Sequence, residues 1–242
     1  MFFFALLLLI ALNVFAVVIE DSVFLEATKP LFIPVFLIFY FLRNKIPSLL
    51  FVLFLISSFL GDLAFSFITI NDIEKVSNFM YFISYLCLIG IIISKFRLAK
   101  IDKIIGAYLL LIFLINSYFL YTIYSILKTI ISDSSEVLVF GLKCTTLIIL
   151  LFVSFIVYLT RESKLSILFL MLGLCLFFSD VLNYINIYYI YDWRFVMLDR
   201  VLHAVALFFI FNYMSESSQI VKKVVLKEKI KEEVMSSENI LA

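Results

Sequence analysis

Ionisable and amide side chains interrupt several long apolar runs of this sequence, and the aspartates among them are the most informative. Asp62 follows Gly61 in one apolar run, and Asp180 follows Ser179 in another, with Asn183 one helical turn further on. An aspartate in hydrocarbon costs about 2.5–3.5 kcal/mol on insertion scales, so such residues normally face a protein interior and mark a functional pathway. We therefore treat the two aspartates as the centre of any chemistry that this chain performs.

Two carboxyl groups in one buried pocket can supply both a general acid and a general base. A desolvated carboxyl group retains its proton, whereas a carboxyl group beside a lysine stays ionised. Lys29 and Lys143 are the candidates for that lysine. This arrangement cleaves glycosidic bonds through an oxocarbenium-like state. A vinyl ether lipid would form the same type of cation when its double bond is protonated, and water would then release an aldehyde and a free hydroxyl group.

Further polar residues within the apolar runs are candidates for binding a substrate. Asp199 and His203 stand one helical turn apart, and Arg200 lies between them in sequence. Arg200 and Lys143 could hold a lipid phosphate near the outer surface of the membrane. Together with Asn183, these residues form the predicted substrate-binding set.

Purely structural roles are open for each of these residues. The two aspartates could be ion-pair partners of Lys29, Lys143 or Arg200, and Lys29 could be an interfacial anchor that snorkels. His203 could hydrogen-bond Asp199 instead of moving protons. Asparagines within membrane spans join helices more often than they bind ligands.

The composition places these residues in a membrane protein. The 242-residue chain is 65% hydrophobic and 15% charged, and a soluble domain could not hide that much apolar surface. The long apolar runs predict an all-α, polytopic helical bundle. Its eight spans are expected at residues 2–19, 29–42, 48–69, 77–94, 104–127, 137–159, 165–188 and 193–214. The membrane domain is thus residues 1–214, followed by a polar tail at 215–242 with a weak amphipathic helical pattern.

Basic residues set the predicted orientation in the membrane. An even number of spans leaves both termini on one side, and lysine and arginine are enriched on the cytoplasmic side. Most of the 19 basic residues fall on the side of the termini, namely Arg43, Lys45, Lys95, Arg97, Lys100, Lys103, Arg161, Lys164, Lys222, Lys223, Lys227, Lys229 and Lys231. Both termini are therefore predicted to be cytoplasmic, and in a bacterium the protein would lie in the inner membrane.

The helical rise predicts the depth of the ionisable residues. At 1.5 Å per residue, Asp62 and Asp180 lie roughly 21 Å from the cytoplasmic face. Lys29, Lys143 and Asp199 lie within roughly 15 Å of the outer face by the same arithmetic. These groups can share one cavity only if the bundle brings together the spans at 29–42, 48–69, 137–159, 165–188 and 193–214.

Several classes of function lack their sequence signatures. We find no G-x-S-x-G, P-loop, dinucleotide-binding or H-E-x-x-H motif. The single histidine and three cysteines without metal spacing make a zinc site unfavourable, so neither a metal nor a cofactor is predicted. Nucleic acid is not expected as a partner because no basic cluster is interleaved with aromatic residues. The predicted partners are the bilayer and a lipid substrate.

The motifs and their order resemble the YhhN/TMEM86 family of eight-span membrane proteins, whose characterised members are lysoplasmalogenases. The resemblance covers nearly the whole chain by span count, and it rests on Lys29-Pro30-Leu31, Gly61-Asp62, and Gly173 with Phe177, Ser179-Asp180 and Asn186. It implies a hydrolase that cleaves the vinyl ether bond of lysoplasmalogen-type lysophospholipids, releasing a fatty aldehyde and a glycerophospho-headgroup. By the same resemblance, Lys29, Asp62 and Asp180 would be the polar active-site residues.

The last span departs from the family pattern. Family members carry a Tyr-rich stretch followed by Ala-Gln, whereas this chain reads Asp199-Arg200-Val201-Leu202-His203, and Lys143 is also unexpected. The chain therefore looks like a divergent branch whose substrate can differ. Two alternatives use the same buried charges: a small proton-coupled transporter, and a non-catalytic membrane protein in which the charges only form packing pairs.

Overall fold

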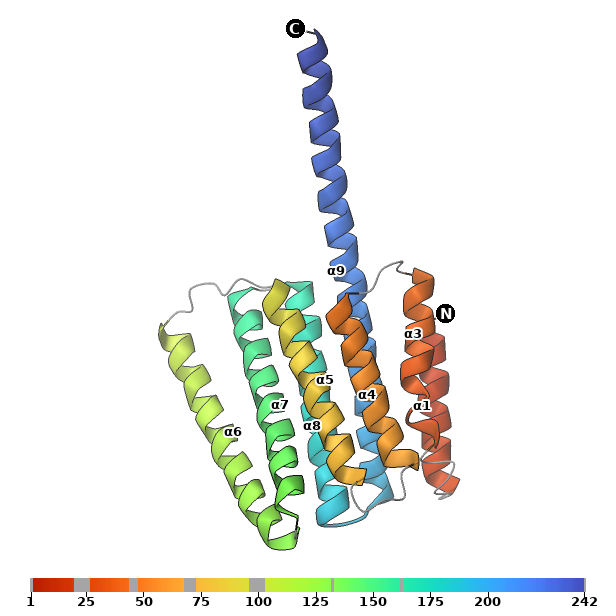
Figure 1. Ribbon diagram of the computed structural model, residues 1–242, viewed down its shortest axis with the longest axis vertical. Helices are drawn as coiled ribbons and strands as arrows, with labels where there is room; N and C mark the ends of the chain where they lie inside the picture. The colour runs from red at the N-terminus through yellow and green to blue at the C-terminus, as the bar shows by residue number, and fades with distance from the viewer. Residues whose placement is uncertain are drawn as a thin grey trace.

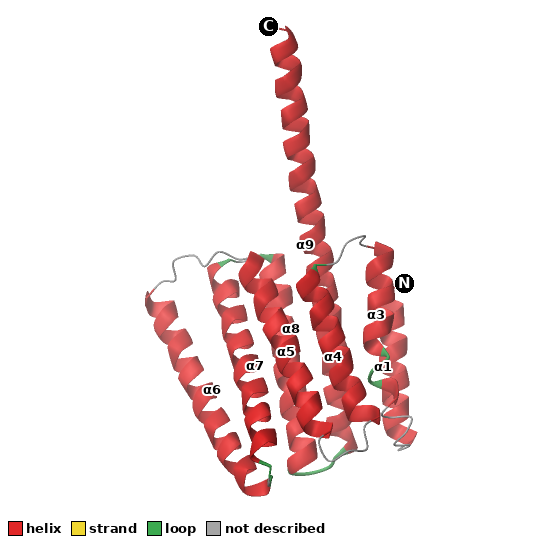
Figure 2. Cartoon of the chain, viewed as in Figure 1, coloured by secondary structure: helices red, strands yellow, loops and turns green. Residues whose placement is uncertain are grey.

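The described part of the computed structural model is helical and contains no strand (Figure 2). The structure describes residues 2–19, 27–43, 48–67, 73–95, 103–131, 133–161 and 163–241. Their helices are α1 (Phe2–Ile19), α3 (Phe32–Arg43), α4 (Leu49–Phe67), α5 (Ile73–Lys95), α6 (Lys103–Ile130), α7 (Ser134–Thr160), α8 (Lys164–Tyr188) and α9 (Trp193–Leu241). The predicted all-α class is therefore confirmed for this part of the chain.

The helices stand side by side in a bundle whose consecutive members run in opposite directions (Figure 1). Helix α9 packs along α8 and also contacts α1 and α3, while α5 contacts both α4 and α7. Helix α6 lies at the edge of the bundle and packs on α7 (Figure 1). Helices α3 and α8 thus both lie against α9, α4 contacts α3, and α5 lies between α4 and α7.

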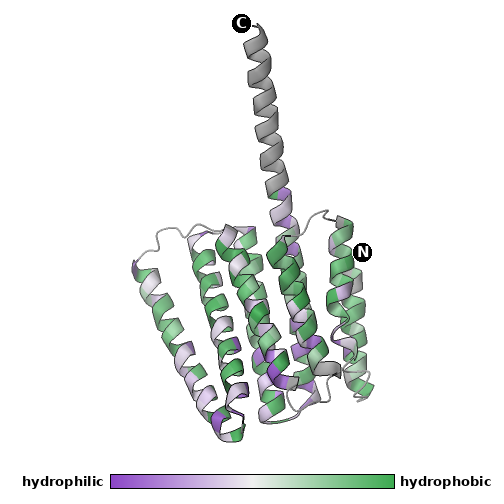
Figure 3. Ribbon diagram, viewed as in Figure 1, coloured by the Kyte–Doolittle hydropathy of each residue, from purple (hydrophilic) through white to green (hydrophobic). Residues whose placement is uncertain are grey.

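The outer surface of the bundle is apolar, which is the reverse of a soluble protein. Phe4, Leu42 and Ile104 are 72–79% exposed, and Figure 3 shows apolar colouring over most of each helix in the bundle. Five helices are long and apolar enough to cross a membrane: Glu74–Ser94, Gly106–Ile130, Ser134–Thr160, Lys164–Tyr188 and Trp193–Ile220. A surface of this kind suits a bilayer as its solvent.

The predicted spans correspond to the observed helices, with ends that differ by a few residues. Lys29 and Pro30 lie in a turn before α3 and not within the helix. Helix α9 continues to Leu241 and projects beyond the bundle (Figure 1). The predicted boundary at residue 214 therefore falls inside a helix. Three residues used to predict the orientation, Lys45, Arg97 and Lys100, lie outside the described residues.

Polar caps define the ends of α7 and α8. Asp133 caps α7 by accepting a hydrogen bond from the Ser135 amide at 2.9 Å, and it pairs with Lys75 of α5 at 3.2 Å. Both contacts hold the pKa of the Asp133 carboxyl below its ordinary value. Ser163 and Ser166 form a capping box at the start of α8. The Lys75–Asp133 pair ties the start of α5 to the start of α7 at one end of the bundle.

Candidate active site

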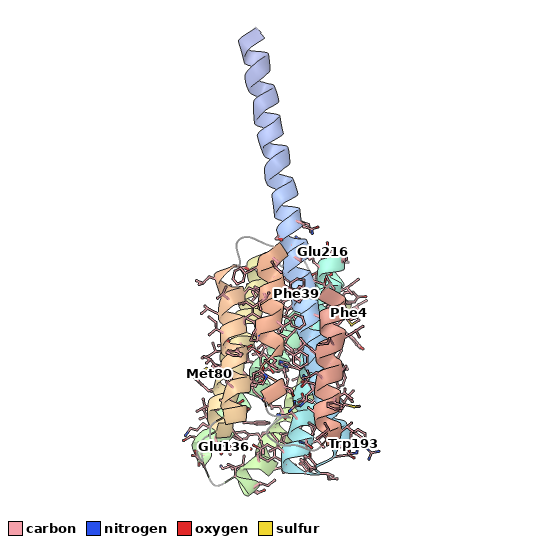
Figure 4. All side chains as sticks on the ribbon, turned by 90° about the vertical axis from the view of Figure 1, so that its right-hand side faces the viewer. Phe4, Phe39, Met80, Glu136, Trp193 and Glu216 are labelled. Atoms are coloured by element: carbon pink, nitrogen blue, oxygen red, sulfur yellow. The ribbon has the colours of Figure 1, made fainter. Side chains whose placement is uncertain are left out.

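Charged side chains meet inside one half of the bundle, near the end where α5, α7 and α9 begin. Glu136 and Trp193 mark this end in Figure 4, and Glu216 marks the opposite end. The lysines and aspartates come from the turn before α3 and from α4, α7, α8 and α9. Their common position near one end agrees with the depth predicted from the helical rise.

Lys29 joins two of the aspartates. Its Nζ atom lies 3.9 Å from Oδ1 of Asp62 on α4 and 3.8 Å from Oδ2 of Asp199 on α9. The Asp62 side chain has no exposed surface, and Asp199 also accepts a hydrogen bond from the Ser179 hydroxyl on α8. Two carboxylates therefore share one lysine in a site that is almost closed to water.

Asp62 also contacts two aromatic side chains on other helices. The Tyr81 hydroxyl on α5 donates a hydrogen bond to Asp62 Oδ1, and His203 Nε2 on α9 lies 3.8 Å from Asp62 Oδ2. A side chain at Gly61 would meet the Tyr81 ring at 3.2 Å, so the glycine lets this ring approach α4 closely. His203 thus faces Asp62 on α4. The partner considered from the sequence was Asp199, which is on α9, the helix that carries His203 itself.

A second ion pair connects α7 to α8. Lys143 Nζ lies 3.3 Å from Asp180 Oδ2, and the Tyr85 hydroxyl of α5 is directed at the same carboxylate. The ammonium group lies 5.9 Å from the centre of the Tyr81 ring and 5.3 Å from that of Phe140. Tyr81 therefore stands between the two ion pairs, with its hydroxyl on Asp62 and its ring beside Lys143.

A small polar cavity opens onto these groups. It holds about 30 Å³ of space, enough for a water molecule. Its lining comes from the turn before α3 and from α5, α7 and α8, and it comprises Lys29, Glu74, Ser77, Asn78, Tyr81, Phe140, Lys143, Asp180, Asn183, Tyr184, Ile187 and Tyr188. Asp180 and Tyr81 thus reach the cavity, whereas Asp62 is behind Tyr81.

An apolar pocket adjoins the same ion pair from the side of α6. It is lined by Phe119, Leu120, Ile123, Phe140, Lys143, Cys144, Leu147, Ile148, Phe177, Asp180, Val181 and Tyr184. Lys143 and Asp180 line both spaces. The pair is therefore at the boundary between a polar chamber and an apolar one, where an amphiphilic molecule would place the junction between its headgroup and its chain.

Arg200 lies apart from both spaces. Its guanidinium donates hydrogen bonds to Asn13 Oδ1 on α1 at 3.0 Å and to Thr28 Oγ1 at 3.1 Å. It lines neither the polar cavity nor the apolar pocket. The position of Arg200 therefore gives no support to its predicted contact with a lipid phosphate, and the residue instead connects α9 to α1.

The buried cluster contains more carboxylates than lysines. Three aspartates, Asp62, Asp180 and Asp199, face the two lysines Lys29 and Lys143. Lys143 faces Asp180 alone, whereas Lys29 is divided between the other two carboxylates. Lys29 therefore holds Asp62 and Asp199 together, while Lys143 and Asp180 form a separate pair.

The structure gathers most of the residues singled out in the sequence. Lys29, Asp180, Lys143 and Asn183 line the polar cavity, and Asp62, Asp199 and His203 lie directly behind them. Sequence reasoning missed Tyr81 and Tyr85. Both are on α5, whose apolar run contains no aspartate, glutamate, lysine, arginine or histidine. The one usable signal was Gly61, whose missing side chain makes room for a ring from a neighbouring helix.

The two ion pairs repeat one pattern along the chain. Lys29 precedes α3 and pairs with Asp62 of α4, while Lys143 is on α7 and pairs with Asp180 of α8. The chain reads Phe59-Leu60-Gly61-Asp62 on α4 and Phe177-Phe178-Ser179-Asp180 on α8, so a similarity in sequence accompanies the similarity of the two ion pairs. Such a pattern is expected of a parallel duplication of four helices.

Comparisons with known proteins give no match for this chain. No family model, no curated protein and no solved structure matches the chain. Within the described residues, no three histidine, cysteine, aspartate or glutamate side chains gather in a way that could hold a metal ion. The functional argument therefore depends on the chain's own residues.

Proposed function

We propose that the chain crosses the membrane eight times with both termini in the cytoplasm. The five long apolar helices account for five of these spans, and the shorter apolar helices Leu7–Ala16, Phe32–Leu42 and Leu49–Ala64 account for the others. The excess of basic residues on the side of the termini supports this orientation. The ion pairs would then lie in the outer half of the bilayer.

Cysteine labelling tests this orientation. In a variant whose three cysteines are replaced by alanine, Ser135→Cys is expected to react with a membrane-impermeant maleimide on intact cells. Lys164→Cys, at the opposite end of the bundle, is expected to react only after the cells are opened. Labelling of both positions, or of Lys164→Cys alone, on intact cells would contradict the orientation.

We propose further that the protein is a hydrolase of the vinyl ether bond in lysoplasmalogen-type lysophospholipids. The observation that carries this proposal is the Lys143–Asp180 pair at the boundary of the polar cavity and the apolar pocket. A lysophospholipid bound there would place its chain on the side of the apolar pocket and its headgroup on the polar side of the ion pair, outside the cavity that has room for a water molecule. The bond between these two parts would lie beside the ionisable groups.

The general-acid part of the mechanism uses His203, Asp62 and Tyr81, in the order in which they contact one another. In this proposal the acid proton starts on Asp62, which shares Lys29 with Asp199. When Asp62 is protonated, it donates its hydrogen bond to the Tyr81 oxygen, and the Tyr81 hydroxyl turns its own proton into the cavity. Asp62 therefore needs no contact with the substrate, and Tyr81 is the group that delivers the proton.

The general base is Asp180. Lys143 lies 3.3 Å from this carboxylate, and the polar cavity beside it has room for a water molecule. Transfer of a proton to the vinyl carbon gives an oxocarbenium ion, and the water attacks that ion while losing a proton to Asp180. Asp180 returns this proton to the departing glycerol oxygen, and the hemiacetal hydroxyl proton passes back through Tyr81 to Asp62. The aldehyde and the glycerophospho-headgroup leave, and the cluster regains its starting protonation state.

The purified protein in liposomes provides the direct test of this function. We expect it to release a fatty aldehyde from lysoplasmalogen and, in D2O, to place one deuterium on the carbon next to the aldehyde carbon. The corresponding alkyl ether lipid, which has no double bond to protonate, is the matched control and is expected to remain intact. Mass spectrometry of the products measures both the release of aldehyde and its deuterium content. Absence of aldehyde, or aldehyde without deuterium at that carbon, would contradict the proposed reaction.

A proton-coupled transporter is the second candidate, because the contacts from His203 through Asp62 to Tyr81 also resemble a buried proton relay. The same liposomes separate the two functions. Proton-dependent uptake of a solute without aldehyde release would favour transport, whereas aldehyde release without flux would favour hydrolysis.

A further inference from the structure

We propose that the exposed face of α6 binds a second copy of this chain, so that the protein forms a symmetric dimer in the membrane. Helix α6 lies at the edge of the bundle and packs on α7 (Figure 1). Only 6% of its most apolar stretch is buried, against 39–50% for the other four long apolar helices. The proposal is independent of the reaction proposed above, because the residues that carry it line neither the polar cavity nor the apolar pocket.

Two tyrosines are exposed near the middle of this face. Tyr118 is 74% exposed and Tyr121 is 69% exposed. Tyr118 is the central residue of the apolar stretch Gly106–Ile130, about 18 Å from each end, and Tyr121 lies one turn further on. Tyrosines that face lipid normally lie at the membrane interface, where water and headgroups bind the hydroxyl group. A tyrosine at the centre of a span is too far from the interface for this.

The hydroxyl groups of these tyrosines have no hydrogen-bond partner among the residues that the structure describes. The neighbouring Thr122 satisfies its hydroxyl group within the helix, by donating to the Tyr118 carbonyl at 3.0 Å. A tyrosine hydroxyl lies too far along its ring to do the same. Hydrocarbon offers no acceptor, so a lipid chain packed on α6 would leave both hydroxyl groups unpaired at a cost in free energy. A helix with hydroxyl groups at the same depth would pair them.

A second copy of the chain supplies such a helix at the required depth. Two copies with the same orientation in the membrane are related by a twofold axis along the membrane normal, so each residue lies level with its own counterpart. A hydroxyl group both donates and accepts, and the tyrosines of one copy can therefore pair with those of the other. Ser125 is also exposed and follows Tyr121 by one turn. It extends the same row of hydroxyl groups.

A hollow beside Tyr121 gives this contact room for a side chain of the second copy. It holds about 300 Å³ of space between α6 and α7. Ser117, Gly141 and Thr145 are among its lining residues, and small residues let helices approach each other closely in membranes. Tyr121 lines the hollow as well. The row of hydroxyl groups and the hollow therefore form one continuous surface.

Disulfide crosslinking of the purified protein in liposomes, at a low ratio of protein to lipid, tests this face. In a variant whose three cysteines are replaced by alanine, Leu111→Cys and Leu114→Cys are exposed on the same side of α6 as Tyr118. Oxidation with copper phenanthroline should link them into dimers. Leu86→Cys, exposed near the middle of α5, is the matched control and should stay monomeric. Monomers from both α6 variants, or equal crosslinking of the control, would overturn the proposal.

Removal of the hydroxyl groups tests the physical reason for the contact. Tyr118→Phe combined with Tyr121→Phe keeps both rings and should raise the dissociation constant of the dimer about tenfold, the effect of about two hydrogen bonds between membrane helices. Tyr108→Phe is the matched control and should dimerise as the wild type does, because Tyr108 is exposed on the same helix but near the start of its apolar stretch.

Single-molecule photobleaching at a series of protein-to-lipid ratios measures these dissociation constants. A wild-type protein that stays monomeric at every ratio would overturn the proposal, and it would leave a different membrane protein as the partner of α6. A folded double variant with the wild-type dissociation constant would overturn it as well. The crosslinking variants retain both tyrosines, so they decide the question even if the double variant fails to fold.

Discussion

Tyr81→Phe is expected to lower the rate of aldehyde release from lysoplasmalogen about 10²–10⁴-fold, the usual contribution of a positioned general acid. The substitution removes one oxygen atom and leaves the ring between the two ion pairs. It breaks the route from Asp62 to the cavity, because Asp62 itself is fully buried. The KM should change little, since the ring that lines the polar cavity is retained. Initial rates in liposomes at several lipid concentrations provide the measurement.

Tyr40→Phe is the matched control for this variant. Tyr40 is also buried, but it packs against Phe51 and Phe211 and lines neither the polar cavity nor the apolar pocket. Its substitution should leave the rate of aldehyde release unchanged. If Tyr81→Phe folds and keeps more than half of the wild-type rate, Tyr81 is not the group that delivers the proton.

Asp62→Ala is expected to lower the free energy of unfolding in detergent by about 3 kcal/mol. Removal of one partner from a buried ion pair usually costs about 3–5 kcal/mol. The lower end applies here because Lys29 keeps Asp199 at 3.8 Å, so that among these groups only the Tyr81 hydroxyl loses a hydrogen-bond acceptor. Thermal and denaturant unfolding of the purified variant would measure the change. The variant should also release no aldehyde, because it lacks the carboxyl group that supplies the acid proton to Tyr81.

An exposed aspartate provides the comparison. Asp133→Asn removes the charge that pairs with Lys75 at the surface, but asparagine caps a helix as well as aspartate does. Its unfolding curve and its rate should match the wild type. An Asp62→Ala protein with an unchanged unfolding curve would contradict the buried cluster. An Asp62→Asn protein that folds and keeps full activity would leave Asp62 with a structural role only.

The sequence by itself determined the class of the protein and the importance of its aspartates. Long apolar runs and the cost of a carboxylate in hydrocarbon are local properties, so they can be read without knowledge of the neighbours. The helical rise is also local, and it predicted that Asp62 and Asp180 lie at one level. These facts narrowed the candidate site to one half of the bundle.

Only the tertiary structure decided which groups face one another. Tyr81 is one of 13 tyrosines in an apolar chain, and nothing in its spacing distinguishes it from those that pack against lipid. Its contact with Asp62 forms because α5 lies against α4 at Gly61 and brings the hydroxyl to that carboxylate. The packing of neighbouring helices likewise pairs Lys143 with Asp180 and places Lys29 between two carboxylates. It also directs Arg200 toward α1. Contacts between helices far apart in sequence depend on how complete faces pack, and the pattern of one helix does not contain that information.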